Sequence, residues 1–168
     1  MLRKASGPKE TFQSPAGLLV ALAGGTLLLD QVTKFVIARF LPLYTHQEVV
    51  PGFFNLVHVR NTGAAFSFLA GSPTLGRQVF FIGVGVVAAG ALLYLYRTAG
   101  GREKAKRAAL ALILGGALGN LADRLRLGAV VDFLDFHIGP YHWPAFNVAD
   151  SAITVGAGIL LISVLRSR

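Results

Sequence analysis

Four long apolar stretches constrain this chain more than any other feature of its 168 residues. They cover residues 16–40, 75–96, 106–123 and 145–165. A helix needs about 20 residues to cross the hydrocarbon core of a bilayer, and each stretch is close to that length. Only 14% of the residues are charged, whereas soluble domains average about 25%. The sequence therefore predicts an all-α integral membrane protein with four transmembrane helices, forming a single membrane-embedded domain over residues 1–168.

The distribution of Lys and Arg predicts the orientation of these helices. Basic residues gather before the first stretch, between the second and third, and after the fourth: Arg3, Lys4, Lys9, Arg97, Arg102, Lys104, Lys106, Arg107, Arg166 and Arg168. The positive-inside rule places all three segments, and both termini, in the cytoplasm. A cleavable signal peptide is the alternative for the first stretch, but no convincing small-residue cleavage site follows its apolar core. Because the net charge of +8 is collected between apolar runs, we expect no nucleic-acid partner.

The two remaining segments, residues 41–74 and 124–144, are then extracytoplasmic. Residues 49–59 read VVPGFFNLVHV, a β-branched and aromatic run with a Pro-Gly break, which predicts short strands. We therefore expect a small extracytoplasmic β-sheet against the membrane, with a short second outer segment beside it. Three aromatic residues near the fourth stretch match the aromatic belt of a membrane–water interface: Tyr141, Trp143 and Phe146.

Three carboxylates lie inside the predicted helices, at Asp30, Asp123 and Asp150. An ionisable residue at the bilayer centre costs about 2.5–3.5 kcal/mol on insertion scales. Counted along each helix, the three acids lie roughly 22–25 Å from the cytoplasmic ends, which is a single depth near the outer edge of the hydrocarbon. One Asp near a helix end could simply extend to the interface, but three at one depth favour a shared site.

Polar neighbours lie on the same helical faces as two of these acids. Asn120 precedes Asp123 by three residues and Arg124 by four, and Asn147 precedes Asp150 by three. Two nearby carboxylates cannot both ionise, so one keeps a proton while the other acts as a base. The base can activate a water molecule for attack on a peptide carbonyl, and the protonated partner can stabilise the oxyanion. This pattern predicts an aspartyl protease.

The other polar groups near these acids have simpler readings. Lys34 follows Asp30 by four residues, the spacing of an intrahelical ion pair, which favours a structural role. Asp132 lies outside the stretches and could pair with Arg124. The four His residues show no metal-ligand spacing, so we expect neither a metal nor another cofactor.

Two other classes of membrane protein are alternatives to a protease. An ion-coupled transporter also keeps acids in its helices, but it usually distributes polar groups through the membrane thickness and often shows inverted repeats. A non-catalytic scaffold would explain small-residue stripes such as Gly115 and Gly119. It would leave the acids without a role. The acids at one depth favour the protease.

Five motif blocks then indicate a family. In order they are Asp30-Gln31-Val32-Thr33-Lys34, Asn61-Thr62-Gly63-Ala64-Ala65-Phe66, Gly119-Asn120-Leu121-Ala122-Asp123-Arg124, Val130-Val131-Asp132-Phe133 and Phe146-Asn147-Val148-Ala149-Asp150-Ser151. From about Asp30 to the end of the fourth stretch, the chain closely resembles the bacterial lipoprotein signal peptidases, also called signal peptidase II. Other intramembrane aspartyl proteases use a Gly-x-Gly-Asp block, which is absent here.

The resemblance implies an aspartic endopeptidase of the bacterial inner membrane that needs no cofactor. Family members remove the signal peptide from a prolipoprotein, cutting before a cysteine that carries diacylglycerol, and they are inhibited by globomycin. The resemblance assigns the catalytic pair to Asp123 and Asp150. It assigns substrate positioning and site shape to Asp30, Lys34, Asn61, Asn120, Arg124, Asp132 and Asn147. We expect a monomer among membrane lipids, with its active site near the outer leaflet.

Overall fold

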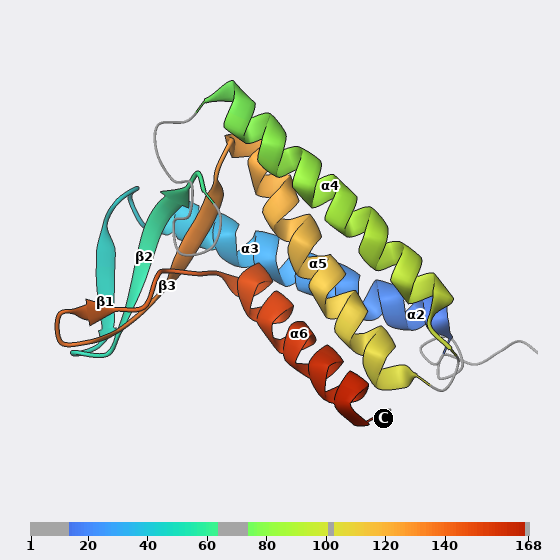
Figure 1. Ribbon diagram of the computed structural model, residues 1–168. Helices are drawn as coiled ribbons and strands as arrows, with labels where there is room; N and C mark the ends of the chain where they lie inside the picture. The colour runs from blue at the N-terminus through green and yellow to red at the C-terminus, as the bar shows by residue number, and fades with distance from the viewer. Residues whose placement is uncertain (1–13, 64–73, 101–102, 167–168) are drawn as a thin grey trace, which may run out of the picture.

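The computed structural model describes residues 14–63, 74–100 and 103–166. Within this part of the chain, four helical segments are long and apolar enough to cross a membrane: Pro15–Phe40, Leu75–Thr98, Lys104–Leu127 and Val148–Arg166. The prediction of a four-helix membrane protein with a small sheet is confirmed (Figure 1). Several residues used above lie outside the described residues: Arg3, Lys4, Lys9, Ala64, Ala65, Phe66, Arg102 and Arg168.

The first span is built from three consecutive segments: α2 (Pro15–Leu19), the π-helical turn η1 (Val20–Gly24) and α3 (Gly25–Phe40). Ser14 caps the start, because its hydroxyl accepts a hydrogen bond from the Gly17 backbone N–H at 3.0 Å. Proline follows immediately as the first helical residue, where its missing N–H costs nothing.

Helix α5 (Lys104–Leu127) lies at the centre of the bundle, in contact with α3, α4 (Leu75–Thr98) and α6 (Val148–Arg166). Glycine allows several close approaches between the helices. A Cβ atom at Gly115 would lie 2.6 Å from the carbonyl oxygen of Ala23. These helices therefore pack backbone against backbone, as small residues permit in membranes.

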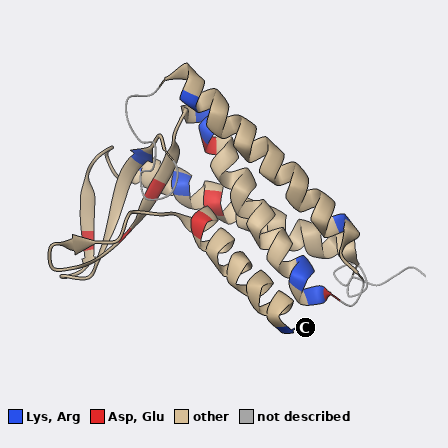
Figure 2. Cartoon of the chain, viewed as in Figure 1, with Lys and Arg blue, Asp and Glu red and all other residues tan. Residues whose placement is uncertain are grey.

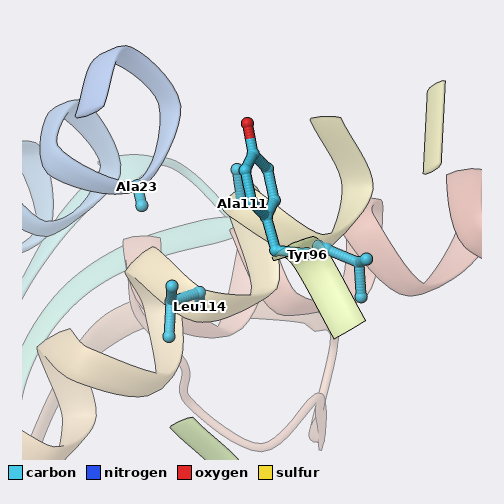
Figure 3. Close-up of a cluster of buried hydrophobic side chains, with 5 residues drawn as sticks. Ala23, Tyr96, Ala111 and Leu114 are labelled. Carbon is cyan, nitrogen blue, oxygen red and sulfur yellow. The ribbon is translucent and has the colours of Figure 1, made fainter. Parts of the chain in front are cut away.

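An apolar cluster joins three segments at the end of the bundle remote from the sheet (Figure 3). The phenol of Tyr96, on α4, donates a hydrogen bond to the Pro15 carbonyl at 2.5 Å, so this buried hydroxyl has a partner. The cluster consists of Ala23, Tyr96, Leu110, Ala111 and Leu114. It ties the start of the first span to α4 and α5.

Both outer segments contribute to one antiparallel sheet of order β1-β2-β3-β4. Its strands are β1 (His46–Val50), β2 (Phe54–Asn61), β3 (Val130–Ile138) and β4 (Tyr141–His142). The first two strands agree with the short strands expected around residues 49–59. Strand β3 was not predicted, although its sequence VVDFLDFHI is rich in β-branched and aromatic residues.

The sheet is attached to the helices at the ends of α5 and α6. Helix α5 ends at Gly128, whose φ of 68° is the left-handed conformation that glycine adopts without strain. The chain then enters β3 directly. Before α6, Phe146 bridges to Leu134 of β3 with backbone hydrogen bonds. Figure 2 shows most of the acidic residues where sheet and helices meet, and Lys and Arg both there and at the far helix ends.

Candidate active site

One pair of carboxylates shares a buried lysine. Lys34, on α3, lies 2.9 Å from Asp30 Oδ2 and 2.8 Å from Asp123 Oδ2. Both Asp residues are almost fully buried, at 0% and 2% exposed. The predicted intrahelical pair of Asp30 and Lys34 is therefore present, and it extends to α5. Lys34 donates a third hydrogen bond to Asn120 Oδ1 at 3.0 Å, so all three ammonium donors have acceptors.

These two carboxylates also hold backbone groups and one further side chain. Asp30 Oδ1 accepts from the Ala149 N–H at 2.9 Å, a free donor in the first turn of α6. Asp123 Oδ2 accepts from the Val131 N–H at 3.1 Å, which fixes the start of β3. Gln31 donates to both carboxylates, at 3.1 Å each. Asp30, Gln31, Lys34 and Asp123 together form what we call the lysine pocket. It joins α3, α5, α6 and the sheet.

A second pair of carboxylates, Asp132 and Asp150, flanks Asn147. The Asn147 side-chain amide donates to Asp132 Oδ1 at 2.7 Å. The Asn147 backbone N–H donates to Asp150 Oδ2 at 3.3 Å. Asn61 donates to Asp132 Oδ2 at 3.1 Å, and Asn120 donates to Asp150 Oδ1 at 2.8 Å. This amide pocket surrounds its two acids with neutral donors, and among the described residues no ammonium group is in hydrogen-bond contact with either.

Each of the three amides is turned toward its acid by a separate anchor. The oxygen of Asn147 accepts the Asp150 N–H at 2.9 Å, as a helix cap does, so its nitrogen must face Asp132. The oxygen of Asn61 accepts the Gly63 N–H at 2.9 Å. The oxygen of Asn120 accepts from Lys34. The lysine pocket thereby orients one donor of the amide pocket.

Electrostatics separate Asp132 from an ordinary carboxyl. Burial, and secondly the charge of Asp150, raise the pKa of Asp132 to about 7, against hydrogen bonds from Asn61 and Asn147 that lower it. Asp132 is only 3% exposed. A carboxyl in this environment exchanges its proton near neutral pH, which is what a general acid or base needs.

Arg124 lies at the edge of the amide pocket. Its guanidinium donates to the Gly63 carbonyl at 3.0 Å and stacks over the Phe81 ring, 5.2 Å from the centroid. Among the described residues no ion pair joins it to Asp132, the pairing that the sequence had allowed. Arg124 instead fixes the backbone just after Asn61.

The structure thus brings all nine predicted site residues into two adjoining pockets. Asp123 was expected to share a proton with Asp150, but its carboxylate is engaged by Lys34, Gln31 and a backbone N–H. These contacts tie the Asp123 carboxylate to α3 and to the start of β3. They suit a positioning role for Asp123. Asp132 has the environment that the prediction required.

Gln31 was not predicted as a site residue. It follows Asp30 directly and so lies off the i, i+4 positions that identified Lys34. Its role depends on reaching across to α5, and no sequence pattern on α3 reveals that distance. For metals, no group of three or more His, Cys, Asp or Glu residues in the described ranges could hold an ion.

Comparisons with known proteins match this chain to one family. The sequence profile of the family described as Signal peptidase (SPase) II matches residues 22–166. The lipoprotein signal peptidase of Geobacter sulfurreducens is 51% identical over 148 residues, covering 88% of this chain and 91% of that protein. That of Syntrophus aciditrophicus is 46% identical over 157 residues, covering 94% and 98%.

A solved structure agrees with the sequence relatives. The fold superposes on a bacterial membrane enzyme with a TM-score of 0.77 at 35% sequence identity, covering 90% of this chain and 95% of the other. A second structure, also described as a bacterial membrane enzyme, has a TM-score of 0.78 at the same identity. The chain therefore belongs to the signal peptidase II family.

Proposed function

We propose that this protein is an intramembrane aspartyl endopeptidase that removes the signal peptide from diacylglyceryl-modified prolipoproteins, cleaving before the lipidated cysteine. The observation that carries this proposal is the amide pocket. It places two carboxylates, Asp132 and Asp150, around one asparagine where the sheet meets the helices. A membrane-embedded acid pair with oriented amide donors is equipped for peptide hydrolysis.

Asp132 and Asp150 form the catalytic pair in this proposal. The pair shares one proton at neutral pH, because burial and the charge of Asp150 raise the pKa of Asp132 to about 7. The ionised member takes a proton from water, and the resulting hydroxide attacks the scissile carbonyl carbon. The protonated member donates to the carbonyl oxygen as it becomes an oxyanion. The proton taken from water then passes to the departing amine.

The lysine pocket supports the pair by holding neighbouring groups in place. Asp123 and Asp30 neutralise Lys34, and Lys34 orients the amide of Asn120 toward Asp150. Asp123 therefore changes from the expected catalytic partner to a positioning residue. Asn61, Asn147 and Arg124 shape the other side of the site.

The proposed location is the bacterial inner membrane, with both termini in the cytoplasm and the sheet outside. Arg97, Lys104, Lys106, Arg107 and Arg166 lie at the helix ends remote from the sheet, in keeping with the positive-inside rule (Figure 2). The enzyme acts as a monomer among membrane lipids. Its lipidated substrate enters sideways from the bilayer, and globomycin inhibits it by occupying the acid site.

The testing experiment is a cleavage assay with purified protein in lipid-supplemented detergent. One substrate is a prolipoprotein carrying diacylglycerol on its cysteine, and the other is the same chain without lipid. We expect the signal peptide to be lost only from the lipidated substrate. Asp132→Asn and Asp150→Asn should each lower the rate by about 10²–10⁴-fold, the usual contribution of an acid–base group.

Asp123→Asn is the matched variant for the choice of catalytic pair. It removes a carboxylate held by Lys34, so cleavage should persist at a reduced rate in protein that remains folded. If Asp123→Asn is inactive while Asp132→Asn cleaves normally, the pair is Asp123 with Asp150, as the sequence resemblance had assigned. Absence of cleavage by a folded wild-type preparation would contradict the protease function itself.

A further inference from the structure

Two hairpin turns of the sheet expose a group of large apolar side chains. Val50 and Phe53, at the β1–β2 turn, are 46% and 49% exposed. Ile138 and Tyr141, at the β3–β4 turn, are 75% and 82% exposed. A backbone hydrogen bond of 2.9 Å from His137 to the Phe53 carbonyl holds the two turns together. With two neighbours, they form the hairpin-tip patch: Val49, Val50, Phe53, Ile138, Tyr141 and Trp143.

The patch lies beside the helix bundle. Figure 1 shows the strands running across the direction of α4, α5 and α6, with both hairpin turns pointing away from the helices. Strand β3 begins just after α5 and has nine residues, so at about 3.3 Å per residue its turn is roughly 30 Å along the strand. The turns therefore overlie the lipid surface next to the bundle.

Charge indicates what kind of surface covers the patch. Residues 46–59 and 130–144 contain no Lys or Arg. The two acids nearest the turns face protein donors: Glu48 accepts from the Gly52 N–H at 3.0 Å, and Asp135 from Asn55 at 2.9 Å. Beside the exposed Glu48, the patch thus presents apolar and aromatic groups without the basic residues that bind anionic headgroups.

Exposed aromatic side chains also lie at the other end of the β1–β2 hairpin, where the chain leaves α3. Phe40, at the end of α3, is 78% exposed, and Tyr44, in the link to β1, is 72% exposed. Trp and Tyr favour the headgroup level of a bilayer, where one part of the ring is apolar and the other is hydrated. Both ends of the first hairpin therefore carry exposed aromatic groups of the kind found at a membrane surface.

We propose that the hairpin-tip patch docks into the headgroup–acyl boundary of the bilayer at the sheet end of the molecule. The sheet would then be held at both ends, by the helices at one and by lipid at the other. The occupant is the membrane of the protein itself, and this proposal does not rest on the catalytic assignment.

The chain contains a single Trp, so Trp143 reports on the patch without labelling. The protein is placed in nanodiscs that hold one copy each, with nitroxide groups attached to the lipid headgroup or to the middle of the acyl chain. Aqueous iodide is the third quencher. We expect the greatest loss of fluorescence with the headgroup nitroxide, less with the mid-chain nitroxide and least with iodide.

Two reporter variants move the Trp to the hairpin turns. Trp143→Phe with Phe53→Trp tests the first turn, and Trp143→Phe with Ile138→Trp tests the second. Both should repeat the order of quenching seen with the native protein. Iodide quenching that exceeds lipid quenching at both turns means that the turns lie in water, and it overturns the proposal. Protection from all three quenchers means that protein covers the patch. That result also overturns the proposal.

A charge variant tests the apolar basis of docking. In the Ile138→Trp reporter, Phe53→Lys should shift quenching from lipid nitroxide toward iodide. Gln47→Lys is the matched control, because it adds the same charge to the same hairpin at a polar residue outside the patch. Circular dichroism and thermal melting confirm that both variants remain folded. Equal quenching in the two variants would show that the patch does not hold the sheet to lipid.

Discussion

The lysine pocket and the amide pocket contain two carboxylates each, yet they differ in what balances the charge. Asp30 and Asp123 share one buried ammonium group, with both contacts under 3 Å. Asp132 and Asp150 receive neutral N–H donors from Asn61, Asn120 and Asn147. For Asp132, burial and the charge of Asp150 outweigh the hydrogen bonds from Asn61 and Asn147, and its pKa is raised to about 7.

This difference separates two roles that the sequence shows as one cluster of acids. The lysine pocket joins three helices and the start of β3, so it serves the fold. The amide pocket has a member with a pKa near 7, so it can serve chemistry. Two residues connect the pockets: Asn120 accepts from Lys34, and Val131 donates its N–H to Asp123 while its carbonyl accepts from Asn147.

The largest expected effect comes from removing the shared cation. Lys34→Met leaves two buried carboxylates without a counter-charge, and the free energy of unfolding should fall by about 3–5 kcal/mol. Lys106→Met is the control, because its ion pair with Glu103 is exposed to solvent and should contribute little to stability. Thermal and denaturant unfolding in detergent measure both. Adding Asp123→Asn to Lys34→Met should restore part of the loss, and a further decrease would contradict the role of the shared cation.

The pH dependence of stability should distinguish the two pockets. The folded pKa of Asp132 is about 7, above its usual 3.8. The folded state therefore binds more protons between these values, and the free energy of unfolding should decrease as pH rises from about 4 to about 7, by roughly 3 kcal/mol. Asp132→Asn should flatten this slope when unfolding midpoints are measured across the range. Asp123→Asn should leave it in place, and a slope that disappears only with Asp123→Asn would reverse the two roles.

Asn147 offers the smallest and most specific test. Asn147→Ala removes the cap of α6 and should cost about 1 kcal/mol of stability. Asn147→Asp keeps an oxygen for the Asp150 N–H but loses the donor to Asp132. It should retain the cap yet lower kcat by about 10²-fold, in line with the loss of one oriented donor. The measurement is melting temperature beside the cleavage rate, and equal rates for Asn147→Asp and wild type would remove this donor from catalysis.

The helices could be predicted from the sequence because membrane insertion leaves a simple signature of length and apolarity. The pair of Asp30 and Lys34 followed from helical spacing, and it is present. The contact of Lys34 with Asp123 joins residues 89 positions apart on different helices, which no local pattern reveals. Strand β3 was overlooked because its two acids, Asp132 and Asp135, interrupt the apolar run.

Local sequence patterns also could not decide whether Asp123 or Asp132 is the catalytic partner of Asp150. Both lie within motif blocks that contain apolar residues. The position of Asp123 along its predicted helix, at the same depth as Asp150, favoured Asp123. The distinguishing property is the neighbour of each carboxylate, a lysine in one case and an asparagine in the other. Neighbours of this kind are set by the packing of α3 against α5 and by the register of β3 beside β2.

The pairing of β2 with β3 has a consequence for biogenesis. Strand β2 leaves the ribosome before α4 and α5, and its partner emerges only after both helices. Strand β2 therefore pairs with β1 alone while α4 and α5 are inserted, and it gains β3 as its second partner afterwards. Because Asp150 follows on the last helix, the two proposed catalytic acids meet only when synthesis is nearly complete. A nascent chain of this protein is thus inactive until its final span has entered the membrane.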